Sequence, residues 1–151
     1  MTGEQRFFED ILKFNQIYKL PTNDTPTPLG PERIRNFHAI LAEEVEEGLD
    51  LAKKYEALQA ARGQSGLARE QVLDVMAELS DWLGDLVVYC ASEARRWGLP
   101  LPEVLRVIME SNFSKLGADG KPIYDERGKV MKGPNYWKPE PKLRDMLSRE
   151  L

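Results

Sequence analysis

The stretch that decides the fold is Ala77-Glu78-Leu79-Ser80-Asp81-Trp82-Leu83-Gly84-Asp85-Leu86-Val87-Val88-Tyr89-Cys90. It contains no proline and its apolar residues recur at helical spacing, so it predicts the middle of a long helix. Between Leu79 and Ser92 the only charged residues are Asp81 and Asp85. We expect a helix this apolar to be mostly buried. A buried carboxylate is costly unless it is paired or bound to a cation.

The acidic residues of this helix fall on one face. Successive residues of a helix lie about 100° apart, so Asp74, Glu78, Asp81 and Asp85 form a single stripe. No Lys or Arg lies between Glu70 and Ala94 to pair with them locally. Like charges at this spacing repel one another. Either some are protonated, or a cation compensates them, or the stripe faces water and pairs with Lys or Arg from elsewhere.

A second acidic group is Glu43-Glu44-Val45-Glu46-Glu47, within a helix predicted from Pro31 to about Ala61. On that helix Glu44 falls near the middle of the apolar stripe, Glu43 and Glu47 lie along its edge, and Glu46 points away. If the two helices pack antiparallel, Glu44, Glu47, Glu78 and Asp81 converge. With one His and no Cys cluster, the expected ligand is a hard cation held by oxygens, Mg²⁺ or Mn²⁺, acting on a phosphate-bearing substrate.

The remaining segments predict an all-α fold. Turn and proline signals delimit a first helix over 4–19, a loop over 20–31 that is more typical of a connector than of a lid, a third helix over about 68–97, a fourth over about 102–117, a hairpin with its loop at 125–128, and a short helix from about 141. We predict one domain, 1–151, built as a four-helix bundle with residues 117–151 as a C-terminal appendage.

The composition narrows the function. The net charge of −4 argues against a general nucleic-acid binder. Acidic residues outnumber basic ones before residue 111 and the reverse holds after it. Cys90 is the only cysteine, so no intrachain disulfide forms, and its apolar neighbours predict a core position. No signal peptide and no membrane span is evident, so we expect a cytoplasmic protein with no membrane partner.

Glu43-Glu44-Val45-Glu46-Glu47 followed by Glu78-Leu79-Ser80-Asp81 resembles the EExxE…ExxD signature of the all-α NTP pyrophosphohydrolases. That superfamily includes MazG-like proteins, dimeric dUTPases and phosphoribosyl-ATP pyrophosphohydrolases. The tail around Asn112-Phe113-Ser114-Lys115 and Lys129-Val130-Met131-Lys132 is similar to that of MazG-like members. The gap between Glu47 and Glu78 is slightly longer than in compact members, which implies a longer helix pair or a larger connector.

The resemblance implies metal-dependent hydrolysis of a nucleoside triphosphate between its α- and β-phosphates, giving a monophosphate and pyrophosphate. Its metal ligands fall on Glu44, Glu47, Glu78 and Asp81, with Asp85 as an extra acid one turn beyond, and its general base falls on Glu43. Asn112 and Lys115 share a helix face. We predict that substrate phosphates meet this pair together with Tyr124, Lys129 and Lys132.

Base recognition and assembly are the remaining expectations. Phe14-Asn15-Gln16 resembles the region where dimeric dUTPases hold uracil, so we predict a base contact by Asn15 and stacking by Phe14 or Trp82. The preferred substrate is expected to be dUTP or a related non-standard dNTP. Alternatives are a phosphoribosyl-ATP pyrophosphohydrolase and a non-catalytic metal-binding scaffold. A bundle this small with so apolar a helix predicts a homodimer or a dimer of dimers, as in the family.

Overall fold

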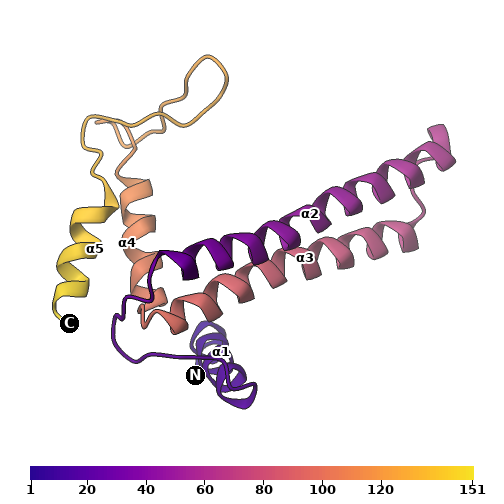
Figure 1. The fold of residues 1–151 in the computed structure, drawn as a ribbon. Coiled ribbons are helices and arrows are strands. Elements are labelled where there is room, and N and C mark those ends of the chain that lie inside the picture. The colour runs from indigo at the N-terminus through magenta and orange to yellow at the C-terminus, as the bar shows by residue number, and fades with distance from the viewer. The chain divides into compact units, whose positions relative to one another are not determined.

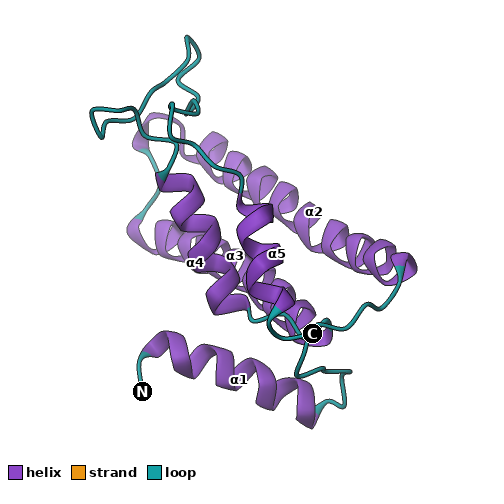
Figure 2. Ribbon diagram, turned by 90° about the vertical axis from the view of Figure 1, so that its left-hand side faces the viewer, coloured by secondary structure: helices purple, strands orange, loops and turns teal.

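The computed structural model describes residues 1–151, and all its regular elements are helices, which confirms the all-α class (Figures 1 and 2). The helices are α1 (Gly3–Ile17), α2 (Pro31–Arg62), α3 (Arg69–Arg96), α4 (Leu101–Phe113) and α5 (Pro139–Ser148), with a 3₁₀ turn η1 (Gly63–Ser65) between α2 and α3. The fourth helix ends at Phe113, before the expected 116–117. The connector after α2 is short, so the wide spacing of the two acidic motifs comes from long helices.

The chain forms two compact units. One comprises Met1–Pro21 and Pro28–Glu93, and the other comprises Thr22–Thr27 and Ala94–Leu151. The first unit thus contains α1, α2 and nearly all of α3, while the second contains α4 and α5. The single domain and the four-helix bundle stay predictions.

In the first unit, α2 and α3 lie side by side as an antiparallel helical hairpin (Figures 1 and 2). Three contacts set the register. Arg33 pairs with Glu93, Trp82 meets Gly48, and Lys54 reaches Glu78. The Arg33 guanidinium donates two hydrogen bonds to the Glu93 carboxylate, at 2.8 and 2.5 Å. This pair is largely shielded from water, and it raises the pKa of Arg33 above its usual value. A two-bond Arg–carboxylate pair fixes geometry as well as contributing energy.

The Trp82 side chain of α3 packs directly against the backbone of α2. A Cβ added to Gly48 would lie 2.3 Å from Cζ2 of the Trp82 ring, so only glycine fits there. The indole Nε1 also donates to the main-chain carbonyl of Glu44 at 2.8 Å. The ring therefore fills space between the two helices, and its N–H is bonded to the backbone one turn before Gly48.

The first helix joins the hairpin through a polar pair. The Asn15 side chain is fully buried. Its Nδ2 donates to the Ser92 main-chain carbonyl at 3.4 Å, and Ser92 Oγ donates to its Oδ1 at 2.8 Å. Because a buried amide without partners is costly, this pair fixes the end of α1 against α3. Ile11 is buried one turn earlier.

In the second unit, residues 22–27 cap the C-terminal end of α3. The Asn23 main-chain N–H donates to the Arg95 carbonyl at 2.9 Å and its side chain donates to that of Arg96 at 2.7 Å. Gly98, with φ of +69°, lies against Thr25, whose carbonyl oxygen would be 1.9 Å from an added Cβ. These contacts satisfy carbonyls that a helix end leaves free.

The rest of the second unit is α4 packed with α5, joined by a long loop (Figure 2). Lys142 donates to Glu110 at 2.6 Å between the two helices. The expected hairpin is present as a turn closed by a single antiparallel bridge, Tyr124 with Val130, and it forms no strand. The Asp125 carboxylate accepts main-chain hydrogen bonds from Arg127 and Lys129, both at 2.8 Å, so it organises the loop.

The prediction that the third helix is mostly buried is wrong for the single chain. Only Val75, Ala91 and Ala94 of α3 are buried apolar residues, whereas Leu83 and Val87 are about half exposed and Cys90 is exposed. Asp81 and Glu78 are exposed as well, and Asp85 is half-buried. The helix is as apolar as the sequence indicates, but the single chain supplies too few neighbouring side chains to cover it. None of the helices combines the length and apolar character that crossing a bilayer takes.

The contact of Trp82 with Gly48 gives the first prediction. We expect Gly48→Ala to lower the free energy of unfolding by about 1–3 kcal/mol, because the added methyl forces the indole off its position. Gly84→Ala, on the same helix pair but with open space around the new methyl, is expected to leave stability unchanged or raise it by up to about 1 kcal/mol. Urea unfolding at one protein concentration compares the two. Equal effects would show that the close contact does not set the helix spacing.

Candidate functional site

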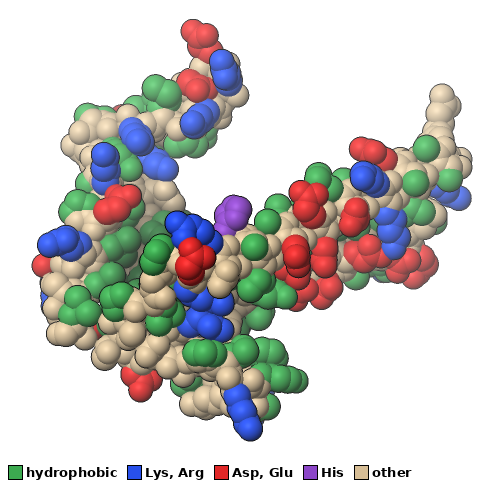
Figure 3. Space-filling model, viewed as in Figure 1, with side chains coloured by type: hydrophobic (Ala, Val, Ile, Leu, Met, Phe, Trp, Pro, Cys, Tyr) green, Lys and Arg blue, Asp and Glu red, His purple; other side chains and the backbone are tan.

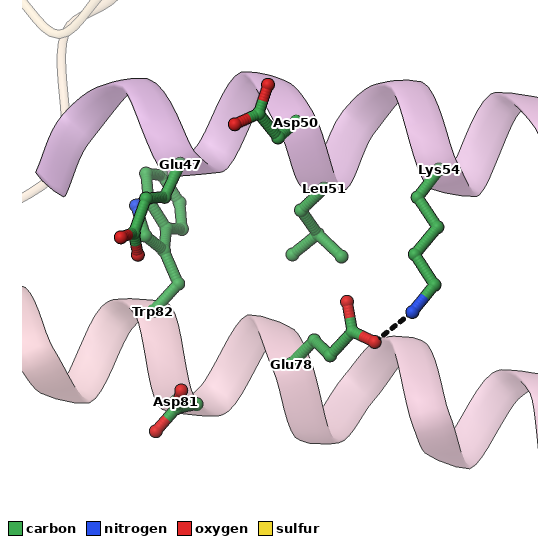
Figure 4. A pocket seen from close by; sticks show the side chains of 7 residues that line it. All are labelled: Glu47, Asp50, Leu51, Lys54, Glu78, Asp81 and Trp82. Atoms are coloured by element: carbon green, nitrogen blue, oxygen red, sulfur yellow. Dashed lines mark hydrogen bonds and ion pairs between the residues drawn. The ribbon is translucent and has the colours of Figure 1, made fainter. Parts of the chain in front are cut away.

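The acidic residues of α2 and α3 meet in a cavity between the two helices. It has a volume of about 430 Å³ and is lined by Glu47, Asp50, Leu51, Lys54, Glu78, Asp81 and Trp82. Figure 4 shows Glu47 and Glu78 directed into the space between the helices, while the carboxylates of Asp50 and Asp81 lie over their own helices. Figure 3 shows acidic side chains gathered over α2 and α3. The convergence predicted for an antiparallel pair therefore brings Glu47, Glu78 and Asp81 to one cavity.

A second cavity adjoins the first, because Glu47 lines both. It has a volume of about 510 Å³ and is lined by Phe14, Leu20, Glu44, Glu47, Asp85, Val88, Tyr89 and Ser92. Acids from α2 and α3 form one part of its wall, and apolar and aromatic side chains form the rest. Pockets for small molecules combine these features at this size, with a few polar groups in an apolar wall.

The carboxylates raise one another's energy. Glu44 raises the pKa of Glu47 most, a small loss of hydration contributes next, and Asp85, Asp81 and Asp50 raise it further. The phenol of Tyr89 donates to Glu44 Oε1 at 3.1 Å, and this hydrogen bond is the main reason that the pKa of Tyr89 is raised above its usual value. A neutral phenol is thus held on one acid, in a field of negative charge that favours a cation.

Lys54 is a residue that the sequence analysis missed. Its ammonium forms an ion pair with Glu78 across the first cavity (Figure 4). Glu78 has no basic residue near it in the sequence. Its partner in the structure, Lys54, comes from the other helix, α2. Lys54 is seven residues after Glu47, so the two share a helix face. That spacing, combined with antiparallel packing, was the signal that could have revealed it.

The donor set fits a hard divalent cation, although the ligands are not gathered into a cage. Carboxylate oxygens from two facing helices are the ligands that Mg²⁺ and Mn²⁺ prefer, and the raised pKa of Glu47 shows that positive charge is favoured there. No group of three or more acids, histidines or cysteines is close enough to hold an ion as the side chains stand. Mutual repulsion and the pairing of Glu78 with Lys54 both separate the carboxylates.

Three other predicted site residues are not free to contact a ligand in the second cavity as the side chains stand. Glu43 is exposed and lines neither cavity. Asn15 is fully buried and bonded to Ser92, so a base contact would need this pair to open. Trp82 lines the first cavity, but its ring packs on Gly48 and its N–H is used by Glu44. Of the predicted base contacts, Phe14 alone lines the second cavity with its ring partly exposed.

The predicted phosphate-binding residues belong to the second unit. Lys115 Nζ donates to Asn112 Oδ1 at 3.0 Å, as their shared face predicts, although Lys115 lies just beyond the end of α4. Lys132 lies over the Tyr136 ring, 4.9 Å from its centre. Tyr124 and Lys129 flank the Asp125 turn, and both are exposed.

Comparison with solved structures finds proteins of similar structure. The chain is similar to a crystal structure from Exiguobacterium sp. 255-15 described as a "putative NTP pyrophosphohydrolase", with 26% identity over 95% of this chain and 94% of that one and a TM-score of 0.49. No family model matches the chain. No curated protein matches it either.

The raised pKa of Glu47 gives a prediction for the metal-free protein. A raised pKa means that the folded protein holds this proton more tightly than the unfolded chain, so stability falls as pH rises from about 4.3 through the raised value. We expect Glu47→Gln to remove that loss. In chelator the variant should be more stable than the wild type at neutral pH, and the difference should vanish near about pH 4.

Urea unfolding across this pH range measures the effect. The matched control is Glu46→Gln, an exposed neighbour that the helical spacing directs away from the cluster. It should leave the pH dependence as in the wild type. The same change in both variants would mean that net charge, and not the cluster, sets the pH dependence.

Proposed function

We propose that this protein is a metal-dependent NTP pyrophosphohydrolase that cleaves between the α- and β-phosphates. One observation carries the proposal. Glu44, Glu47, Glu78 and Asp81 line two adjoining cavities beside α2 and α3, and Glu47 lines both. One cavity offers acids for a cation, and the other adds a partly apolar wall for the rest of a nucleotide. The products would be a nucleoside monophosphate and pyrophosphate.

Glu44, Glu47, Glu78 and Asp81 would hold Mg²⁺ or Mn²⁺, and Asp85 would add a further oxygen. When bound, such an ion lowers the pKa of water and neutralises phosphate charge. Glu43, beside Glu44 on α2, would accept the proton of the attacking water, since a carboxylate suffices once the water is acidified. The Tyr89 hydroxyl orients Glu44 by donating to Oε1.

The second cavity would hold the base. Phe14 offers a partly exposed ring there, set against Tyr18 with ring centres 4.4 Å apart. Val88 and Tyr89 supply the apolar wall, and Ser92 supplies a hydroxyl whose proton is directed to Asn15. We propose dUTP or a related non-standard dNTP as substrate. A wall that excludes the C5 methyl of thymine would separate dUTP from dTTP.

Basic residues of the second unit would meet the phosphates. Asn112 and Lys115 already bond to each other, so their polar ends are held as a pair. Lys129, Lys132 and Tyr124 extend a polar and mostly basic surface along the following loop. An ammonium and an amide together supply donors for a polyanion that the acidic cluster alone would repel.

We further propose that the protein is a homodimer formed through α3, or a dimer of such dimers. Leu73, Met76, Leu83 and Val87 recur at spacings of three, seven and four residues, so they share a face, and each is about half exposed. Leu83 and Val87 each follow an acid by two residues, which places this stripe about 200° round the helix from Asp81 and Asp85. A second copy could cover the apolar stripe while leaving the acids open.

The activity is tested by pyrophosphate release from dUTP, dCTP, dTTP, dATP, dGTP and the ribonucleotides, with Mg²⁺ or Mn²⁺ and with chelator. We expect metal-dependent release that favours dUTP. Glu47→Gln and Glu78→Gln should abolish turnover and weaken metal binding. Glu43→Gln should cut the rate about 10²–10⁴-fold while leaving metal affinity nearly intact, because it removes only a general base.

Glu46→Gln serves as the control and should keep wild-type turnover. Near-normal activity in both Glu47→Gln and Glu78→Gln would sink the site assignment. Metal binding without pyrophosphate release from any of these nucleotides would favour phosphoribosyl-ATP as substrate, or a non-catalytic scaffold.

The oligomer is tested by light scattering after size-exclusion chromatography. We expect the wild type at twice the chain mass or more and Leu83→Glu at the chain mass, since a charge on the stripe cannot be buried without a partner. Glu70→Gln, on the same helix outside the stripe, should leave the mass unchanged. A wild-type monomer would refute the proposed interface.

A further inference from the structure

Lys54 is the one basic side chain lining a cavity whose other ionisable residues are all acids. The cavity presents Glu47, Asp50, Glu78 and Asp81, and the Lys54 ammonium reaches from α2 across to α3 to pair with Glu78 (Figure 4). Lys54 thus brings positive charge to a carboxylate that the proposed function assigns to the metal.

Folding energy is a weak explanation for this pair. The Lys54 and Glu78 side chains are 53% and 44% exposed. Ion pairs with this much contact with water contribute little to stability, because solvent screens the charges and two long side chains must be ordered. The pair nevertheless sets the direction of the Glu78 carboxylate. In the first cavity this carboxylate points toward Lys54 and away from Asp81 (Figure 4).

The Lys54–Glu78 pair also helps to explain why the carboxylates do not form a complete set of metal ligands. The acids do not stand close enough together to hold an ion, and Glu78 is one of those held by another partner. A divalent cation carries twice the charge of an ammonium and attracts several carboxylates at once. It can therefore take Glu78 from Lys54, but part of its attraction is offset by the ion pair that breaks.

We propose that Lys54 is an internal counter-ion that holds Glu78 in the metal-free protein and is displaced when a divalent cation binds. This inference rests on the proposed function for its metal site. Lys54 is a positioning residue, because it acts through Glu78. Its effect is to weaken metal binding and to keep the empty cavity from accumulating unpaired negative charge.

The test measures Mn²⁺ affinity without nucleotide, by titration calorimetry or by the electron paramagnetic resonance signal of free Mn²⁺. Lys54→Met removes the charge and keeps the length of the side chain. We expect it to bind Mn²⁺ roughly two- to five-fold more tightly, the factor that corresponds to losing an exposed ion pair. Lys54→Arg keeps the charge and should bind as the wild type does.

Two controls separate this pair from general electrostatics. Lys53→Met lowers the net charge by the same amount at an exposed neighbouring position outside the cavity, and it should leave Mn²⁺ affinity nearly unchanged. In a Glu78→Gln background the pair is already broken, so adding Lys54→Met should give a smaller gain than in the wild type. This non-additivity is what a direct interaction produces.

Each outcome decides the matter. Tighter binding in Lys54→Met alone, with the smaller gain in the double variant, supports the counter-ion. Unchanged or weaker binding overturns it, as does an equal gain in Lys53→Met. A raised KM for nucleotide with unchanged Mn²⁺ affinity would assign Lys54 to the phosphates instead. If the wild type, Glu47→Gln and Glu78→Gln all fail to bind Mn²⁺, the proposed metal site itself is wrong and the inference falls with it.

Discussion

The contact between the Trp82 indole and Gly48 is the constraint on which the site depends. The ring occupies the space where a Cβ would be, and its N–H is bonded to the backbone of α2 at Glu44. It therefore limits the spacing of α2 and α3 and, together with the Arg33–Glu93 and Lys54–Glu78 pairs, sets their register. Glu44 and Glu47 stand within one turn of Gly48, and Glu78, Asp81 and Asp85 stand within one turn of Trp82. The two acidic motifs face each other because this contact is in place.

The same constraint holds like charges together, and the chain answers this in two ways. It provides donors of its own, the Tyr89 hydroxyl on Glu44 and the Lys54 ammonium on Glu78. The other carboxylates still repel one another, and this repulsion raises the pKa of Glu47. Repulsion of this kind would not stabilise a packing interface, since apolar residues at the same positions would be more stable. It is useful where a cation is to be bound and released, because the carboxylates lose repulsion when it arrives.

The long helices and most of the acidic cluster can be predicted from the sequence. The features that cannot be predicted share one physical cause. Helical periodicity gave the long α2 and α3, and the 100° rotation placed Glu47, Glu78 and Asp81 on facing sides. The Asp125 turn and the Asn112–Lys115 pair followed from local spacing. The Lys54–Glu78 pair, the burial of Asn15 and the exposure of Cys90 did not follow. Each depends on which side chain a distant helix brings near, and local patterns carry no such information.

The wrong expectation about α3 points to how the helix is used. Its apolar content predicts a helix that is mostly buried, and hence buried acids, but the helical rotation places most of its acidic and exposed apolar residues on different faces. Glu78 and Asp81 line the cavity beside α2, while Leu83 and Val87 are about half exposed and line a further cavity together with Asp81 and Asp85. A helix with one acidic and one apolar face can be fully covered only by different neighbours, and the cavity side must stay open to admit a ligand. The apolar side carries no such requirement. Leu73 and Met76 line none of the cavities that the acids line, so substitutions at these two positions can alter the stability of α3 without altering the surroundings of its acids.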